Sequence, residues 1–166
     1  QQAIASDDPV VFMEPKRRYW ESGEVDTESA PAPLWSSRVV RPGSDATLIT
    51  YGPMVKTCLD SARAAEADGL DLEVIDLRTL SPLDLGPVVE SVRRTGHAIV
   101  VHEAARTLGL GAEIAARVGD ECFYSLESPV QRVTGYDMPY PPSRVEHDFL
   151  PGLDRILDAV DRARAY

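Results

Sequence analysis

The sequence predicts an α/β fold with three layers, in which helices cover both faces of an open, mainly parallel sheet of about five strands. Short apolar runs of strand length alternate with segments whose apolar residues recur three and four positions apart. Helices between such strands act as right-handed crossovers, which join parallel strands of one sheet. The alternation begins near residue 46, so residues 46–166 are expected to form the domain.

Four strands are expected within this domain, each a short apolar run bounded by turn residues. These runs are 46–51, 72–77, 98–101 and 131–134. Apolar residues at helical spacing predict a helix after each strand, and the last helix, which starts near Leu153, is amphipathic. Gly69 is expected to end the first helix. Ser81 as N-cap, with Pro82 at the first helical position, is expected to start the second.

Residues 1–45 follow a different pattern. Residues 1–6 suggest the end of a helix, residues 10–13 a short strand, and the alternating prolines of residues 30–33 an extended linker. One strand and a helix end cannot bury a hydrophobic core. We therefore expect residues 1–45 to be an arm left from a preceding domain that this sequence does not contain.

The amino-acid composition indicates which classes of partner the chain can bind. The chain has 17 Lys and Arg against 27 Asp and Glu, which gives a net charge of −10. Such a surface repels phosphate backbones and argues against nucleic acid as a partner, whereas it suits a basic protein. No apolar run approaches the roughly 20 residues that span a bilayer, so no membrane contact is expected. Cys58 and Cys122 form neither a CxxC pair nor a metal-ligand cluster, which fits a reducing cytoplasm.

Chemical groups gather where the third predicted strand ends. His102 and Glu103 have the side chains of a general base and its orienting partner. Adjacent residues of a strand point to opposite faces, however, so the two are poorly placed to pair with each other. A structural histidine at a strand end is the favoured interpretation.

The loops that follow the first and third strands could face each other across a crevice if those two strands are neighbours. One loop contains Gly52, and the other runs from Glu103 to Gly109 and carries Arg106. A small anion would fit between them, with His102 as a further candidate. Gly109 and Gly111 resemble a phosphate cradle, but the spacing is not GxGxxG, so close packing of helix and strand is the favoured role.

Five segments together resemble one family. They are TYGPMV at 50–55, DLRTLSPLD at 76–84, VVHEA at 100–104, GLGAEI at 109–114 and LESPVQRVTGYDMPYP at 126–141. In this order they resemble the C-terminal half, the transketolase C-terminal domain, of the beta subunit of thiamine-diphosphate-dependent 2-oxoacid dehydrogenases. Residues 8–20 resemble the last strand and exit segment of the preceding pyrimidine-binding domain. The segments HEAARTLGLGAEIA, ECF and RVTGYDMPYP are more similar to the branched-chain type than to the pyruvate type.

The resemblance implies a parent complex that decarboxylates a 2-oxoacid on thiamine diphosphate, with magnesium, and then acylates a lipoyl group. The family's cofactor-activating glutamate and active-site histidine belong to the N-terminal half, and no position of this chain matches either. We therefore assign no catalytic, cofactor-binding or metal-binding residue. The chain alone is expected to bind no cofactor and to be inactive.

The resemblance also implies a role in assembly. The family's partners are the alpha subunit, a second beta subunit and the subunit-binding domain of the lipoyl acyltransferase. The features associated with docking that domain map onto Glu127 and the carboxylate of Tyr166. A bacterial-type cytoplasmic location is favoured over the mitochondrial matrix. Two alternatives stay open, namely a C-terminal piece of another transketolase-like enzyme and a stand-alone domain that binds a small anion.

Overall fold

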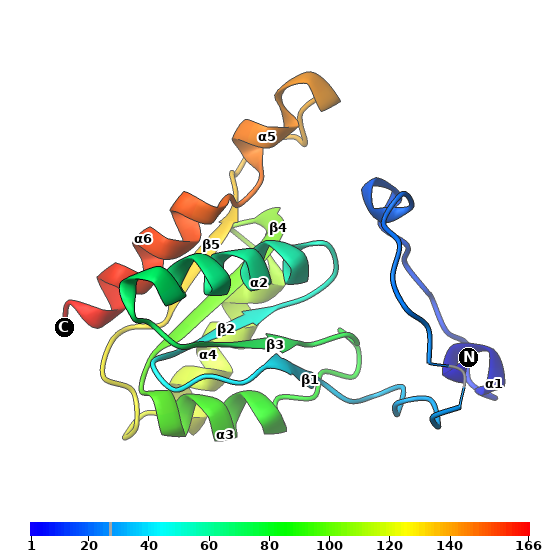
Figure 1. The fold of residues 1–166 in the computed structure, drawn as a ribbon, viewed down its shortest axis with the longest axis horizontal. Helices are drawn as coiled ribbons and strands as arrows, with labels where there is room; N and C mark the ends of the chain where they lie inside the picture. Colours follow the sequence, from blue (N-terminus) through cyan, green and yellow to red (C-terminus); the bar gives the residue numbers. More distant parts are fainter. Residues whose placement is uncertain (27) are drawn as a thin grey trace.

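A five-stranded sheet forms the centre of the computed structural model, which describes residues 1–26 and 28–166 (Figure 1). The strands are β1 (Arg38–Arg41), β2 (Ala46–Thr50), β3 (Leu72–Asp76), β4 (Ala98–Ala105) and β5 (Gln131–Gly135). Their order in the sheet is β1-β3-β2-β4-β5, and only β1 runs antiparallel to its neighbour. Every residue of β2 is buried, as expected for a parallel strand that is covered on both faces.

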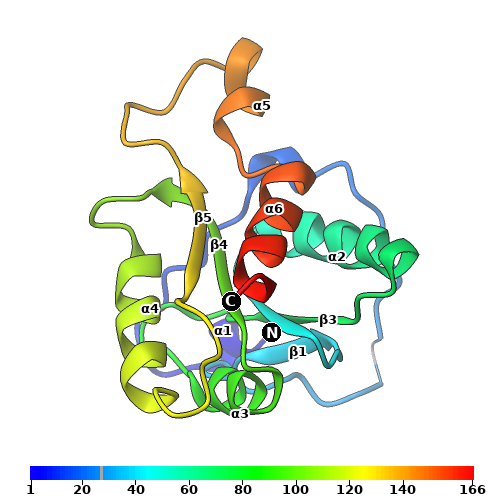
Figure 2. The ribbon, with the colours of Figure 1, turned by 90° about the vertical axis from the view of Figure 1, so that its left-hand side faces the viewer.

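Helices cover both faces of this sheet (Figure 2). The principal helices are α2 (Met54–Ala65), α3 (Gly86–Thr95), α4 (Leu110–Glu121) and α6 (Leu153–Arg164). Short elements are α1 (Gln2–Ala5) and α5 (Glu146–Phe149), with 3₁₀ turns at Lys16–Arg18, Glu66–Asp68 and Ser143–Val145. Helices α2 and α6 bury their apolar faces on one side of the sheet, and α3 and α4 on the other. The predicted three-layer α/β fold is confirmed.

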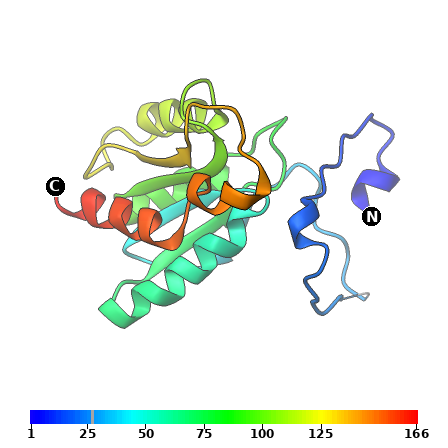
Figure 3. The same ribbon diagram turned by 90° about the horizontal axis from the view of Figure 1, so that it is seen from above.

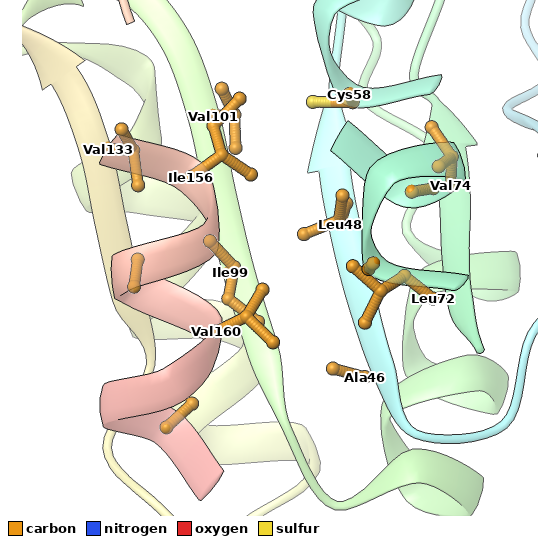
Figure 4. Close-up of a cluster of buried hydrophobic side chains, with 14 of the residues drawn as sticks. Ala46, Leu48, Cys58, Leu72, Val74, Ile99, Val101, Val133, Ile156 and Val160 are labelled. Carbon is orange, nitrogen blue, oxygen red and sulfur yellow. The ribbon is translucent and has the colours of Figure 1, made fainter. Parts of the chain in front are cut away.

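Alternate residues of the strands supply the two cores. Leu48, Val74 and Ile99 point toward α2 and α6, where they pack against Cys58 and Ile156 (Figure 4). Their strand neighbours point to the opposite face, toward α3 and α4. This alternation follows from the pleat of each strand. Both cysteines are free and buried, and burial raises the pKa of the Cys58 thiol to about 12.

Strand β1 was not predicted, because four residues before Pro42 give too short a pattern to show a period. These residues were expected to belong to the arm, but Arg38 pairs with Asp76 and Val39 pairs with Ile75 at the edge of the sheet. Arg41 fixes the strand further through ion pairs with Glu66 and Asp71.

Two other predictions of local structure were wrong. Residues 10–13 form no strand, since their backbone pairs with no neighbouring strand and their side chains are largely exposed. Helix α3 begins at Gly86 rather than at Pro82. Asp84 explains the later start, because its carboxylate accepts hydrogen bonds from the backbone N–H groups of Gly86 and Ser37.

The arm lies at the carboxyl ends of the strands. Arg17 forms an ion pair with Glu103 at the end of β4, and Arg18 donates to the carbonyl of Pro53, just after β2. Figure 3 shows the N-terminus and the C-terminus at opposite ends of the molecule. Among residues 1–26 and 28–166, no helix has the length and apolar character needed to cross a membrane.

Candidate functional site

His102 is a packing residue at the carboxyl end of β4. Its side chain is fully buried, and its Nε2 accepts a hydrogen bond of 3.1 Å from the backbone N–H of Gly111 in α4. The ring of Tyr51 stacks on the imidazole, with 6.0 Å between centroids. An Nε2 that accepts a hydrogen bond carries no proton, so the imidazole is neutral. Burial lowers the pKa of His102 and favours the same state.

Glu103 faces away from His102 and contacts the arm. Its carboxylate pairs with Arg17, and no hydrogen bond joins it to His102 within the described part of the chain. Burial raises the pKa of Glu103, and the positive charge of Arg17 opposes that change. The two residues therefore do not form a base and its orienting partner in this arrangement.

Gly109 and Gly111 allow α4 to approach β4. A Cβ atom on Gly111 would lie 2.2 Å from Nε2 of His102, and one on Gly109 would lie 2.2 Å from the carbonyl oxygen of Ala105. Real Cβ contacts are not this short, so a side chain at either position would displace the helix. The structure supports close packing rather than a phosphate cradle at these glycines.

The four crevice candidates do not converge on one cavity. Strands β2 and β4 are neighbours, so the loops that follow them lie at the same end of the sheet. Gly52 forms the turn into α2 with a φ of 58°, whereas Arg106 donates to the carbonyl of Arg132 in β5. A hollow of about 310 Å³ lies nearby, but none of Gly52, His102, Glu103 and Arg106 lines it. Its lining residues come from the arm, α2, α5 and the link between α5 and α6: Arg17, Arg18, Met54, Thr57, His147, Leu150, Pro151 and Gly152.

These residues do not fit thiamine diphosphate with magnesium. Within the described ranges, no group of three or more His, Cys, Asp and Glu side chains could hold a metal ion. The two candidates with suitable chemistry, His102 and Glu103, are already engaged by Gly111 and Arg17. These residues therefore support no step through that cofactor.

Glu127 lies at the other end of the sheet, before β5. Its backbone N–H donates to the carbonyl of Gly96, which precedes β4, and its side chain is 74% exposed. The Cγ and Cδ atoms cross Gly96 so closely that a Cβ atom there would lie 2.9 Å from both. His97 Nε2 is 3.5 Å from the Glu127 carboxylate, and His97 Nδ1 is 3.1 Å from the Ser128 hydroxyl. The backbone of Glu127 is thus fixed, and its carboxylate faces solvent.

Tyr166 is exposed at the same end of the sheet. Arg155, near the start of α6, donates to the carbonyl of Thr134 near the end of β5, so α6 begins at the carboxyl end of that strand. The helix has 12 residues and rises about 18 Å, which carries Tyr166 to the amino end (Figure 2). Glu127 and Tyr166 therefore share the amino end of the sheet, away from the arm.

Two exposed aromatic residues at this end, Phe123 and Tyr124, follow α4 and were not predicted from the sequence. Apolar residues after an amphipathic helix usually belong to the core, so their type gave no signal of exposure. Their consecutive positions could have indicated exposure, because two adjacent residues just after a helix rarely both pack into one core.

Gly111→Ala should destabilise the chain by about 1–3 kcal/mol, since the new methyl group would overlap the buried imidazole. Denaturant unfolding of the purified chain measures this free energy. Gly119→Ala is the matched control in the same helix, where a Cβ atom meets nothing within 4 Å, and it should be neutral or stabilising by up to about 1 kcal/mol. Equal stability of the two variants would contradict the packing role of Gly111.

His102 should also shape the pH dependence of stability. Its pKa lies below the ordinary 6.5 in the folded chain, so the unfolded chain binds the proton more readily. The stabilisation is therefore fully present above about pH 6.5 and is lost as the pH falls below that value. His102→Gln should remove this loss below about pH 6.5, measured as the slope of unfolding free energy against pH. Glu103 and Asp76 have raised pKa values, so they change the stability with pH in the opposite direction. Both residues are present in the unmodified chain and in the His102→Gln variant, so their effect cancels in the comparison. Parallel slopes for the two proteins would contradict the role assigned to His102.

Among known proteins, beta subunits of 2-oxoacid dehydrogenases are similar to this chain. The chain is 52% identical over 166 residues to the pyruvate dehydrogenase E1 component subunit beta of Leifsonia xyli, which covers 100% of this chain and 49% of that protein. It is also 52% identical over 161 residues to the 3-methyl-2-oxobutanoate dehydrogenase subunit beta of Mycobacterium tuberculosis, with 96% and 46% covered. The chain thus spans about half the length of these relatives.

A solved structure and a family model agree with this comparison. A split-gene transketolase, described as an inactive beta4 tetramer, matches 86% of this chain and 46% of its own chain, with a TM-score of 0.69 and 25% identity. The model for the transketolase C-terminal domain matches residues 36–156, which include β1. The chain belongs to the transketolase C-terminal domain family, and its homologues include the beta subunits of pyruvate and branched-chain 2-oxoacid dehydrogenases.

Proposed function

We propose that this chain is the assembly and docking part of a 2-oxoacid dehydrogenase beta subunit. In this proposal the parent complex decarboxylates a 2-oxoacid with thiamine diphosphate and magnesium and passes the acyl group to a lipoyl group. The other half of the beta subunit and the alpha subunit supply the catalytic groups. The similarity to two beta subunits over nearly the whole chain supports this role.

The position of Glu127 is the observation on which the docking proposal depends. Its carboxylate is exposed on a fixed backbone at the amino end of the sheet, together with Tyr166. The arm and the engaged groups His102 and Glu103 lie at the opposite end. A basic subunit-binding domain of the acyltransferase could therefore bind at the amino end without disturbing the contacts of the arm.

The segment between β5 and α6 supports a role in assembly. It projects from the domain around α5 (Figure 1) and exposes Met138, Tyr140 and Val145. Met138 and Val145, together with Phe149, line an apolar hollow of about 240 Å³. Exposed apolar surface of this kind is typical of protein interfaces. We assign it to contact with the alpha subunit or the second beta subunit.

We favour a branched-chain 2-oxoacid as the substrate of the parent complex. The support is the similarity of three segments, HEAARTLGLGAEIA, ECF and RVTGYDMPYP, to the branched-chain type. The relatives named for 3-methyl-2-oxobutanoate and for pyruvate are equally identical to this chain over their matches, so overall identity does not separate the two types.

Glu127→Gln tests the docking proposal in the assembled dehydrogenase. Titration with the subunit-binding domain of the acyltransferase should show a Kd raised about 10-fold or more, because a charge-assisted hydrogen bond is lost. The affinity should also depend less steeply on salt. Glu113→Gln is the matched control, since it removes an exposed carboxylate from the first turn of α4 at the other end of the sheet. An unchanged Kd for Glu127→Gln at low salt would overturn the docking role of this residue.

A further inference from the structure

Two consecutive arginines hold the arm against the carboxyl end of the sheet. Arg17 forms an ion pair with Glu103 at the end of β4, and Arg18 donates a hydrogen bond of 2.6 Å to the carbonyl of Pro53 after β2. Strands β2 and β4 are neighbours, so the two contacts lie close together. No other group in the first 26 residues forms a hydrogen bond or an ion pair with the sheet or the helices that cover it.

The two arginine side chains are partly buried in these contacts. The side chain of Arg17 is 30% exposed and that of Arg18 is 24% exposed. Both line the hollow of about 310 Å³, together with Met54 and Thr57 of α2. Solvent screens a partly buried ion pair less than one on an open surface, so these contacts restrain the arm more than surface pairs would.

The charges around Glu103 favour an arginine at this position. Burial raises the pKa of Glu103, the charges of Arg17 and Arg18 lower it, and the nearby carboxylate of Glu146 raises it. The two arginines therefore offset the repulsion between Glu103 and Glu146. Arg18 also pairs with Glu21, which belongs to the arm and moves with it.

The chain has a second attachment further along, after β3. The hydroxyl of Thr79 donates to the carbonyl of Leu34, and the carboxylate of Asp84 accepts a hydrogen bond from the backbone N–H of Ser37. Leu34 lies 16 positions after Arg18, a length that can span roughly 50 Å when extended. If the arginines were released, the arm could therefore move over a distance greater than the width of a small domain.

We propose that Arg17 and Arg18 latch the arm onto the loops that follow β2 and β4, and that this latch fixes where the other half of the beta subunit leaves the domain. The inference rests on the proposed function, in which that half precedes the arm. Three apolar side chains just before the latch, Val11, Phe12 and Met13, are exposed, so the segment that the latch holds has surface available for contact with that half.

The purified chain tests the latch itself. Trypsin cuts after Arg18 only when its side chain and backbone are free, so the cleavage rate reports release of the arm. Glu103→Gln should raise this rate about 3-fold to 10-fold, because a charge-assisted contact is lost. Glu113→Gln is the matched control and should leave the rate unchanged, since it removes an exposed carboxylate at the same end of the sheet without touching the arm.

Exchanging the two charges separates the ion pair from other effects of substitution. Arg17→Glu alone places two carboxylates together and should speed cleavage after Arg18. Adding Glu103→Arg to that variant restores an ion pair of opposite direction and should slow the cleavage again. Both variants have the same sequence around the cleaved bond, so only the contact with residue 103 differs. Equal rates for the two variants, or no effect of Glu103→Gln, would overturn the latch.

The assembled dehydrogenase, with alpha and full-length beta subunits, tests what the latch positions. Glu103→Gln should again speed cleavage after Arg18, which separates the two halves of the beta subunit and is measured by mass spectrometry. An unchanged rate there would mean that other contacts hold the arm, and the positioning claim would be overturned. None of these rates depends on the acyltransferase, so the docking role of Glu127 stands or falls separately, on its own titration.

Discussion

The cover of helices on both faces of the sheet is the constraint on which the other features depend. Helices α2 and α6 on one face and α3 and α4 on the other bury every residue of β2. No face of the central strands is therefore left for a ligand or a partner. Loops that reach solvent lie at the two ends of the strands. The polar and aromatic residues considered as candidate sites are therefore found at one end or the other.

The carboxyl end is occupied by contacts within the chain. In related α/β folds this end is where ligands bind, and here it contains His102 and Glu103. His102 is buried against α4, however, and Glu103 is paired with the arm. The amino end has the opposite character, because the side chains of Glu127, Tyr166, Phe123 and Tyr124 are exposed there. This contrast supports the proposal that a partner docks at the amino end.

The sequence was sufficient to predict the central strands and the helices that cover them, but not the edge strand of the sheet. Alternating apolar runs identified β2, β3, β4 and β5, because buried strands and amphipathic helices impose distinct periods. Strand β1 has too few residues to show a period, and its pairing with β3 depends on residues some 35 positions away. The apolar residues 10–13 had the composition of a strand but have no neighbouring strand to pair with. The composition of a segment does not show whether a neighbouring strand is present to pair with it.

The location of the candidate docking residues could also be predicted only in part from the sequence. Glu127 and Tyr166 were chosen through the family resemblance. That they lie at the same end of the sheet depends on the direction of α6, which the hydrogen bond from Arg155 to Thr134 in β5 shows.

The central claim is that the amino end of the sheet receives a basic partner. Hydrogen exchange of the assembled dehydrogenase, with and without the subunit-binding domain, tests it most directly. The account predicts new protection in residues 120–128 and near Tyr166, and none in residues 51–55 and 103–109. Protection confined to those two carboxyl-end loops would contradict it.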